Sequence, residues 1–133
     1  MTTDFFRFPQ TPHIAWLGKG MPRDDKVLSA DEGGHLLAGE VAVEEKLDGA
    51  NLGFSLAPDG VLRAQNRGQY LAHPHAGQFA RLADWLDLHG DTVHTALALH
   101  ADAGLMLFGE WCAARHSLDY TALPDWFLLF DVY

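Results

Sequence analysis

The spacing of apolar residues changes along the chain and divides it into an irregular start, a strand-rich segment, a helical segment and a final strand-rich segment. Residues 1–40 show no sustained apolar period, and several prolines and the pair Gly33-Gly34 interrupt any long element. We therefore expect residues 1–40 to be an irregular lead-in to a folded region that begins near Val41.

Residues 41–70 have the pattern of an antiparallel meander. Val41 and Val43 alternate with smaller or charged residues, and the turn signals Asp48-Gly49 and Asp59-Gly60 follow them. Between the two turns, apolar side chains occupy every second position: Leu52, Phe54 and Leu56. A period of two is typical of strands with one buried face, so three consecutive strands are predicted.

Residues 77–103 change to a helical period. Four apolar residues recur at spacings of three and four, with charged residues on the other face: Phe79, Leu82, Ala83 and Leu86. Asp91 is a candidate N-cap for a second helix, and Gly104 follows as a candidate stop. Two helices are therefore predicted in this segment.

Residues 105–133 return to strands. The run 105–108 is apolar and leads into Gly109-Glu110-Trp111, and a second apolar run extends from Trp126 to Tyr133. Strands followed by helices and then by strands predict an α+β domain with a mostly antiparallel sheet. Because the last run reaches the final residue, we expect this domain to be incomplete at its C-terminus.

Length and composition indicate one ordinary globular domain, since the chain has 133 residues, of which 48% are apolar and 20% charged. The net charge is −9, from 18 acidic and 9 basic residues. This acidity argues against nucleic-acid binding by charge alone, because phosphate contacts need lysine and arginine. The single cysteine excludes an intramolecular disulfide, and no secretory leader or membrane-length apolar run is present, so we expect a cytoplasmic protein.

The segment around Lys46 concentrates the candidate chemistry. Lys46 lies where a predicted strand meets the Asp48-Gly49 turn, which can direct its amine toward a ligand. Gly49 allows the backbone to approach a ligand closely, and Asn51 can donate to or accept from a base or ribose edge. Taken alone, the pattern is also that of a solvent-exposed hairpin carrying a surface lysine.

Further along the chain, three kinds of side chain could contact a nucleotide. Arg67 follows the predicted third strand, and the planar fork of arginine suits ribose and phosphate oxygens. Glu110 follows an apolar run and is either solvated or placed to bind a ribose hydroxyl. Phe127 and Phe130 lie in the last strand, where an aromatic face can stack on adenine or pack in the core.

Taken in this order, these segments resemble the covalent nucleotidyltransferase superfamily of polynucleotide ligases and capping enzymes. The Lys-x-Asp-Gly motif of that superfamily corresponds to Lys46-Leu47-Asp48-Gly49. The longer string 45–51, together with Arg67-Gly68, 108–111 and 130–133, is most similar to the ATP-dependent RNA ligase family. The resemblance covers most of the chain and implies an antiparallel-sheet adenylation domain.

The resemblance also implies a role for each matching residue around the lysine. Lys46 would attack the α-phosphorus of ATP, forming lysyl-AMP and releasing pyrophosphate, with Mg²⁺ or Mn²⁺ bridging phosphate oxygens. Glu45 and Asn51 would lie near the adenosine. Asp48 and Gly49 would shape the turn beneath the phosphate.

For the later segments, the resemblance implies contacts with the rest of the nucleotide and with RNA. Arg67 would contact the ribose or the 5′-phosphate of the substrate, and Glu110 would bind the ribose hydroxyls. Phe130 would stack on the adenine, with Phe127 as the alternative. No residue is implied as a direct metal ligand. AMP would then pass to an RNA 5′-phosphate, and a 3′-hydroxyl would displace it to join the RNA ends.

The chain departs from the family pattern in one respect. Two later motifs, a Glu-Gly pair and a Lys-x-Lys pair, have no counterpart in residues 1–133. Those lysines would neutralise the triphosphate and the leaving pyrophosphate. Their absence leaves the activity of this chain open, and a second chain is one candidate source of the missing motifs.

Other interpretations of the same residues remain open. A DNA ligase adenylation domain shares the lysine motif, and a truncated non-catalytic remnant could bind a nucleotide or a partner chain. His73-Pro74-His75 could contribute to a metal site, although two histidines with no third ligand at close spacing are more often loop residues.

Overall fold

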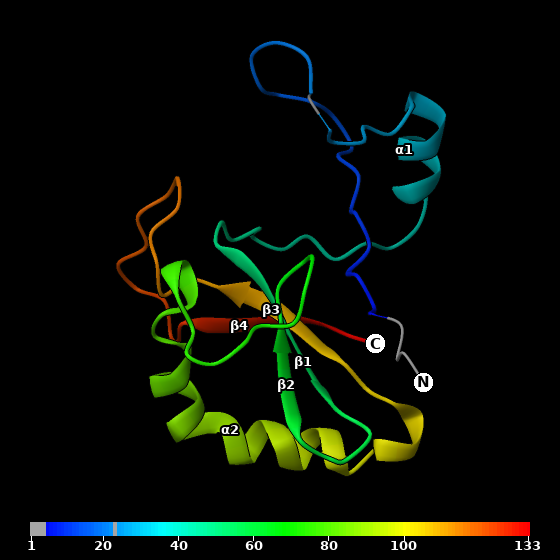
Figure 1. Cartoon of the computed structure of the whole chain (residues 1–133). Helices are drawn as coiled ribbons and strands as arrows, with labels where there is room; N and C mark the ends of the chain where they lie inside the picture. Colours follow the sequence, from blue (N-terminus) through cyan, green and yellow to red (C-terminus); the bar gives the residue numbers. More distant parts are fainter. Residues whose placement is uncertain (1–4, 23) are drawn as a thin grey trace. The chain divides into compact units, whose positions relative to one another are not determined.

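The computed structural model describes residues 5–22 and 24–133. They form two compact units, Phe8–Lys46 and Leu47–Tyr133, and the second unit also includes residues 5–7. These are called the small and the large unit below, and their elements are labelled in Figure 1.

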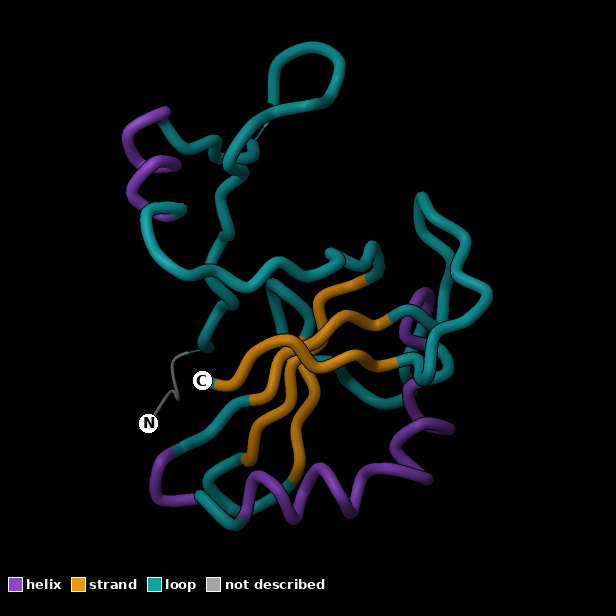
Figure 2. The backbone as a smooth tube through the Cα atoms, turned by 180° about the vertical axis from the view of Figure 1, so that it is seen from behind, coloured by secondary structure: helices purple, strands orange, loops and turns teal. Residues whose placement is uncertain are grey.

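The large unit is an α+β fold built on a four-stranded antiparallel sheet with the strand order β2-β1-β3-β4. The strands are β1 (Ala50–Leu56), β2 (Leu62–Gln65), β3 (Leu107–Trp111) and β4 (Phe127–Val132). Helix α2 (Leu82–Ala98) runs beside the sheet, with the 3₁₀ turns η1 (Gly77–Phe79) before it and η2 (Ala101–Ala103) after it (Figure 2). The predicted α+β class with antiparallel pairing is confirmed.

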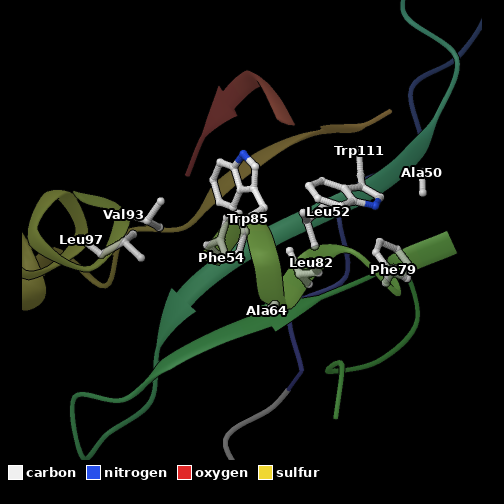
Figure 3. Close-up of a cluster of buried hydrophobic side chains, with 10 residues drawn as sticks. All are labelled: Ala50, Leu52, Phe54, Ala64, Phe79, Leu82, Trp85, Val93, Leu97 and Trp111. Atoms are coloured by element: carbon white, nitrogen blue, oxygen red, sulfur yellow. The ribbon is translucent and has the colours of Figure 1, made fainter. Parts of the chain in front are cut away.

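The core of the large unit lies between α2 and the face of the sheet that carries Leu52 and Phe54. Both side chains are fully buried, as is Leu82 on α2. Trp85 stacks on Phe54 with the ring centroids 5.7 Å apart, and Figure 3 shows the strand and helix side chains meeting in this layer. Burial of each large apolar side chain contributes roughly 1.5–3 kcal/mol, so this layer holds α2 on the sheet.

The opposite face of the sheet carries a polar pair beside an aromatic cluster. Asn51 on β1 pairs with Glu110 on β3, so both side chains project from this face. Two positions further along β1, Gly53 pairs with Phe108, whose side chain is fully buried and lies near the ring of Phe6. The N-terminal segment of the large unit thus contributes to the aromatic part of this face.

The strand predicted around Val41 and Val43 does not form. Residues 41–48 have no regular secondary structure, and the first strand begins at Ala50. Val43 is 91% exposed, because no neighbouring strand covers the apolar side chains of this segment. The predicted three-stranded meander is therefore a two-stranded hairpin of β1 and β2.

The two helices predicted in residues 77–103 are one helix between two 3₁₀ turns. Helix α2 continues through Gly90 and Asp91 because its buried residues keep a helical spacing across them, from Trp85 to Val93 and Leu97. This burial outweighs the cost of about 1 kcal/mol for a glycine inside a helix. The predicted stop is confirmed, since Gly104 has a φ of 63° and follows η2.

The small unit contains a helix that the sequence analysis missed, α1 (Ala30–Leu36). Its N-cap is Ser29, whose hydroxyl accepts from the Glu32 N–H, while the Ser29 N–H donates to Glu32 Oε2 at 2.8 Å. These hydrogen bonds lower the pKa of Glu32. The prediction of an irregular segment was wrong here because Gly33-Gly34 suggested a break, whereas the Ser-x-x-Glu capping box starts a helix.

Helix α2 has 17 residues and is the longest helix in the part of the chain that the structure describes. Within residues 5–22 and 24–133, none of the helices combines the length and the apolar character that crossing a membrane requires.

Replacement of Leu52 by alanine tests the core. The side chain is fully buried beneath α2, so Leu52→Ala should lower the free energy of unfolding by about 2–5 kcal/mol in urea denaturation. Leu129→Ala is the matched control, because Leu129 is 53% exposed and its loss should change that free energy by less than about 0.5 kcal/mol. Equal effects of the two substitutions would contradict the assignment of the core face.

The bond between α2 and the segment before β4 should make stability depend on pH. Asp125 Oδ1 accepts from the Trp85 indole N–H at 2.6 Å and from the Phe127 N–H at 3.0 Å. Partial burial alone would raise the pKa of Asp125, but these hydrogen bonds lower it below the ordinary value of 3.8. The stabilisation is therefore complete above that value and is lost as the pH falls through the lowered pKa.

Asp125→Asn should consequently destabilise the protein most near neutral pH, and the difference from the wild type should shrink as the pH falls below about 4. Denaturant titrations at several pH values measure this difference. Asp87→Asn, which removes an exposed carboxylate from α2, serves as the control and should show a smaller pH-dependent difference. A constant difference for Asp125→Asn across the range would show that its charge does not contribute.

Candidate functional site

A cleft of about 460 Å³ lies in the large unit at the start of β1. Residues 49–51 form one wall, and the turn 66–69 after β2 forms another. Gln78 and Phe79 of η1 and His116 of the β3–β4 loop complete the lining. The cleft thus brings together three residues expected at a nucleotide site, namely Gly49, Asn51 and Arg67.

The Asp48-Gly49 turn that leads into β1 is held by hydrogen bonds from two other elements. Its Gly49 N–H donates to Glu110 Oε1 on β3 at 2.9 Å. The Asp48 N–H donates to the Tyr120 hydroxyl at 2.7 Å, and Asp48 Oδ2 accepts from both the N–H and the hydroxyl of Ser117. Groups 61 to 72 residues away in sequence therefore fix the conformation of this turn.

Gly49 lies too close to β3 for any side chain. A Cβ on Gly49 would be 2.4 Å from the Trp111 carbonyl oxygen and 2.9 Å from Cys112 Sγ. Because the first of these atoms belongs to the backbone, it cannot move aside without disturbing the β1–β3 pairing. The glycine of the motif is thus needed here for close packing of the turn.

Asn51 presents an acceptor that the protein does not use. Its Oδ1 is buried and has no hydrogen-bond partner in the described structure, and Asn51 lines the cleft. A buried amide oxygen without a partner costs free energy, which a ligand N–H could recover. Glu110 faces Asn51 across the β1–β3 pair and lies within β3 rather than after it.

Arg67 lies in a turn that the side chain of Asn66 stabilises. Asn66 Oδ1 accepts from the N–H groups of Gly68 and Gln69, each at 2.9 Å, and the Asn66 N–H donates to the Gln69 carbonyl. Asparagine favours such turns because its side chain can bond to its own backbone two residues on. The exposed Arg67 is therefore displayed on a defined backbone at the rim of the cleft.

The two aromatic candidates on β4 lie in different environments. Phe127 packs against Phe54 and Trp85, with centroid distances of 5.2 and 5.5 Å, so its ring lies against the core. Phe130 is 46% exposed and lies at the register shift between β3 and β4, where Phe108 is opposite Asp131 and Gly109 is opposite Leu129. It does not belong to the described lining of the cleft.

Glu45 and Lys46 are exposed and belong to the small unit, of which Lys46 is the last residue. The chain connects Lys46 through a single residue, Leu47, to the hydrogen-bonded Asp48-Gly49 turn. The backbone path from the lysine to the cleft wall is therefore short.

Cys112 follows β3 beside Gly49. Partial burial, and after it the charges of Glu110 and Asp48, raise the pKa of the Cys112 thiol. The thiol therefore stays protonated near neutral pH and is a poor nucleophile.

His73 and His75 lie with their ring centroids 5.5 Å apart. Burial, and after it the neighbouring His73, lower the pKa of His75. Among the residues that the structure describes, no three His, Cys, Asp or Glu side chains gather in a metal-binding arrangement.

Sequence reasoning missed the contribution of Ser117 and Tyr120. Both lie in the irregular β3–β4 loop, where no periodicity or motif indicates which side chains reach the Asp48-Gly49 turn. Gln78 was missed as well: its carbonyl accepts from the Trp111 indole N–H at 2.8 Å, which ties η1 to β3. These contacts depend on the tertiary fold and leave no local pattern.

Replacement of Gly49 by alanine tests the close packing of the turn. The added methyl group meets backbone, so Gly49→Ala should lower the free energy of unfolding by about 1–3 kcal/mol in denaturant titrations. Gly39→Ala is the control, because no heavy atom lies within 4 Å of a Cβ at Gly39, and it should be tolerated. A Gly49→Ala variant as stable as the wild type would contradict the observed approach of the turn to β3.

Comparison with known proteins places most of the chain in one family. The model of the RNA ligase family matches residues 39–133, a range that contains the Lys-x-Asp-Gly motif and all the described lining residues of the cleft. No curated protein and no solved structure matches the chain. The family match spans more than half of the chain, and this protein therefore belongs to the RNA ligase family.

Proposed function

We propose that this protein is an ATP-dependent RNA ligase-type adenylyltransferase that forms lysyl-AMP on Lys46. One observation carries the proposal: the family match includes Lys46-Leu47-Asp48-Gly49, and residues 49–51, which begin three positions after this lysine, form a wall of the cleft. A nucleophile joined so closely to a ligand-sized cleft suits covalent catalysis.

The side chains around the cleft suit a nucleotide in several ways. The buried Asn51 Oδ1 can accept a hydrogen bond from an adenosine N–H, which supports a role for Asn51 in base recognition. Arg67 at the rim can bind the ribose or a phosphate, and Glu110 beside Asn51 can accept from a ribose hydroxyl. Glu45 and Phe130 are assigned to the adenosine by family resemblance alone.

The assignment of Asp48 and Gly49 to the turn beneath the phosphate is supported by how firmly both residues are held. Their backbone N–H groups already donate to Tyr120 and Glu110. We therefore infer that Asp48 and Gly49 shape the backbone after Lys46 and that their N–H groups do not donate hydrogen bonds to the nucleotide.

In the first step, the Lys46 Nζ lone pair forms a bond to the α-phosphorus of ATP. The bond from that phosphorus to the bridging oxygen breaks, pyrophosphate leaves, and the amine loses a proton to solvent. An RNA 5′-phosphate oxygen then attacks the same phosphorus, the P–N bond breaks, and the Lys46 amine is regenerated as it takes up a proton. Finally, an RNA 3′-hydroxyl attacks the 5′-phosphate and loses its proton to solvent, and AMP leaves as the phosphodiester forms. The RNA 5′-phosphate and 3′-hydroxyl ends are thus the proposed polymer substrates.

The described residues do not form a protein cage for Mg²⁺ or Mn²⁺. No three potential ligands gather, and the two carboxylates at the turn, those of Asp48 and Glu110, already accept hydrogen bonds. Mg²⁺ commonly enters such sites bound to substrate phosphates with several waters retained. We therefore propose that the metal arrives as the complex with ATP.

We further propose that positive charge for the triphosphate comes from outside the described lining of the cleft, and a second chain is one candidate source. Of the described residues that line the cleft, Arg67 alone carries a fixed positive charge, while His116 becomes charged only when protonated. A triphosphate and its leaving group require more than one positive charge for compensation. The overall charge of −9 makes a basic partner electrostatically favourable.

Labelling with ATP tests the proposal. The purified chain is incubated with α-labelled ATP and Mg²⁺ or Mn²⁺ and then separated by denaturing electrophoresis. Label should remain on the wild-type chain and be absent from Lys46→Ala, because only Lys46 forms the phosphoramidate. Lys26→Ala, which removes a lysine from another part of the small unit, is the matched control and should keep its label.

The same experiment separates the competing functions. No label on a chain shown by circular dichroism to be folded would overturn the proposed activity of this chain and favour a non-catalytic remnant. Label that transfers to a 5′-phosphorylated DNA strand but not to the equivalent RNA would instead favour a DNA ligase.

A further inference from the structure

The β3–β4 loop, residues 112–126, is fixed at its base although it has no regular secondary structure. The Cys112 N–H donates to the Trp126 carbonyl at 2.7 Å, directly beyond the pair formed by Trp111 and Phe127. Figure 1 shows the loop, in orange, extending beyond the strands that it joins. Its position is therefore set by the sheet.

A second attachment ties the end of this loop to α2. Asp125 accepts from the Trp85 indole N–H, and the Arg81 guanidinium lies over the Trp126 ring at 4.0 Å from its centroid. Arg115 and Asp119 form an ion pair of 3.7 Å within the loop. The loop is thus braced on the same helix that packs on the core face of the sheet.

From this braced loop, two hydroxyl side chains reach Asp48. The Tyr120 hydroxyl accepts from the Asp48 N–H, and Ser117 donates to Asp48 Oδ2 through both its N–H and its hydroxyl. Hydrogen bonds to a carboxylate are among the stronger ones in proteins. These contacts meet on one residue, which stands two positions after Lys46.

We propose that Ser117 and Tyr120 are positioning residues for Lys46. Tyr120 holds the Asp48 N–H and Ser117 holds the Asp48 carboxylate, while Glu110 holds the Gly49 N–H, so that the backbone that follows Lys46 is restricted in conformation. Neither residue contacts reacting atoms in this assignment. Their effect is to reduce the number of backbone conformations that the lysine segment samples before the reaction.

The same loop also reaches the cleft, because His116, the residue before Ser117, belongs to the cleft lining. A nucleotide in the cleft would therefore lie against the residue adjacent to a turn-holding side chain. Binding of the ligand and fixation of the turn are thus expected to support each other.

This inference rests on the proposed function, and two measurements separate the two. The first is amide hydrogen exchange of residues 47–51 in the absence of ATP, which reports on the turn alone. The second is the rate of Lys46 labelling by α-labelled ATP as a function of ATP concentration. The variants are Tyr120→Phe and Ser117→Ala, with Ser117→Thr as a conservative replacement that keeps the hydroxyl.

In Tyr120→Phe and Ser117→Ala, exchange of the Asp48 amide should become at least about tenfold faster, because the turn opens more often. The maximal labelling rate should fall by about tenfold or more, since small displacements of a reacting group carry large costs. The ATP concentration at half-maximal rate should change by less than about threefold. Ser117→Thr should recover much of the rate.

Tyr70→Phe and Ser55→Ala are matched controls, because they remove hydroxyls from other parts of the large unit and should leave both readouts unchanged. Unchanged exchange in Tyr120→Phe and Ser117→Ala, or faster exchange with an unaltered labelling rate, would overturn the inference. A wild-type chain that takes no label overturns the proposed function, and the exchange data then still decide whether Ser117 and Tyr120 hold the turn.

Discussion

The packing of α2 against one face of the antiparallel sheet is the constraint on which the candidate site depends. Leu52 and Phe54 must face the helix, and since side chains alternate along a strand, Asn51 must then face the other way. The β1–β3 pairing places Glu110 opposite Asn51 and brings the start of β1 against the end of β3. An apolar layer on one side of the sheet thus determines where the polar groups stand on the other side.

Two kinds of contact form the candidate site: strand pairing positions some of its side chains, and hydrogen bonds from a loop fix the turn before β1. Asn51 and Glu110 take their places from strand register, whereas Asp48 takes its conformation from a loop about seventy residues further along the chain. Such long-range contacts order a backbone segment that would otherwise sample many conformations. The chain belongs to the RNA ligase family, and only Leu47 separates the lysine of the proposed reaction from Asp48. The ordered backbone of Asp48 and Gly49 therefore bears directly on the proposed chemistry.

Much of this arrangement could be predicted from the sequence, and the remainder depends on tertiary contacts. Alternation of Leu52, Phe54 and Leu56 identified β1, and the apolar spacing that begins at Phe79 identified the helical segment. The same rules predicted a strand at Val41, where burial is absent, and a break near Gly90, where continuous packing maintains the helix. The Lys-x-Asp-Gly motif marked the segment that leads into β1, where a bend at Gly49 replaces the predicted hairpin turn. Ser117 and Tyr120 could not be found because a loop conformation has no period.

The alternation in β1 also restricts how this protein can vary during evolution. Insertion or deletion of one residue between Gly49 and Phe54 would move Asn51 to the helix-facing side of β1 and an apolar side chain to the opposite side, so changes of length in this strand should be removed by selection. By contrast, β4 already contains one extra residue at Phe130, and the irregularity there absorbs it without altering the order of the sheet. Homologous chains should therefore keep the length of β1 constant while they differ in length along the outer strand.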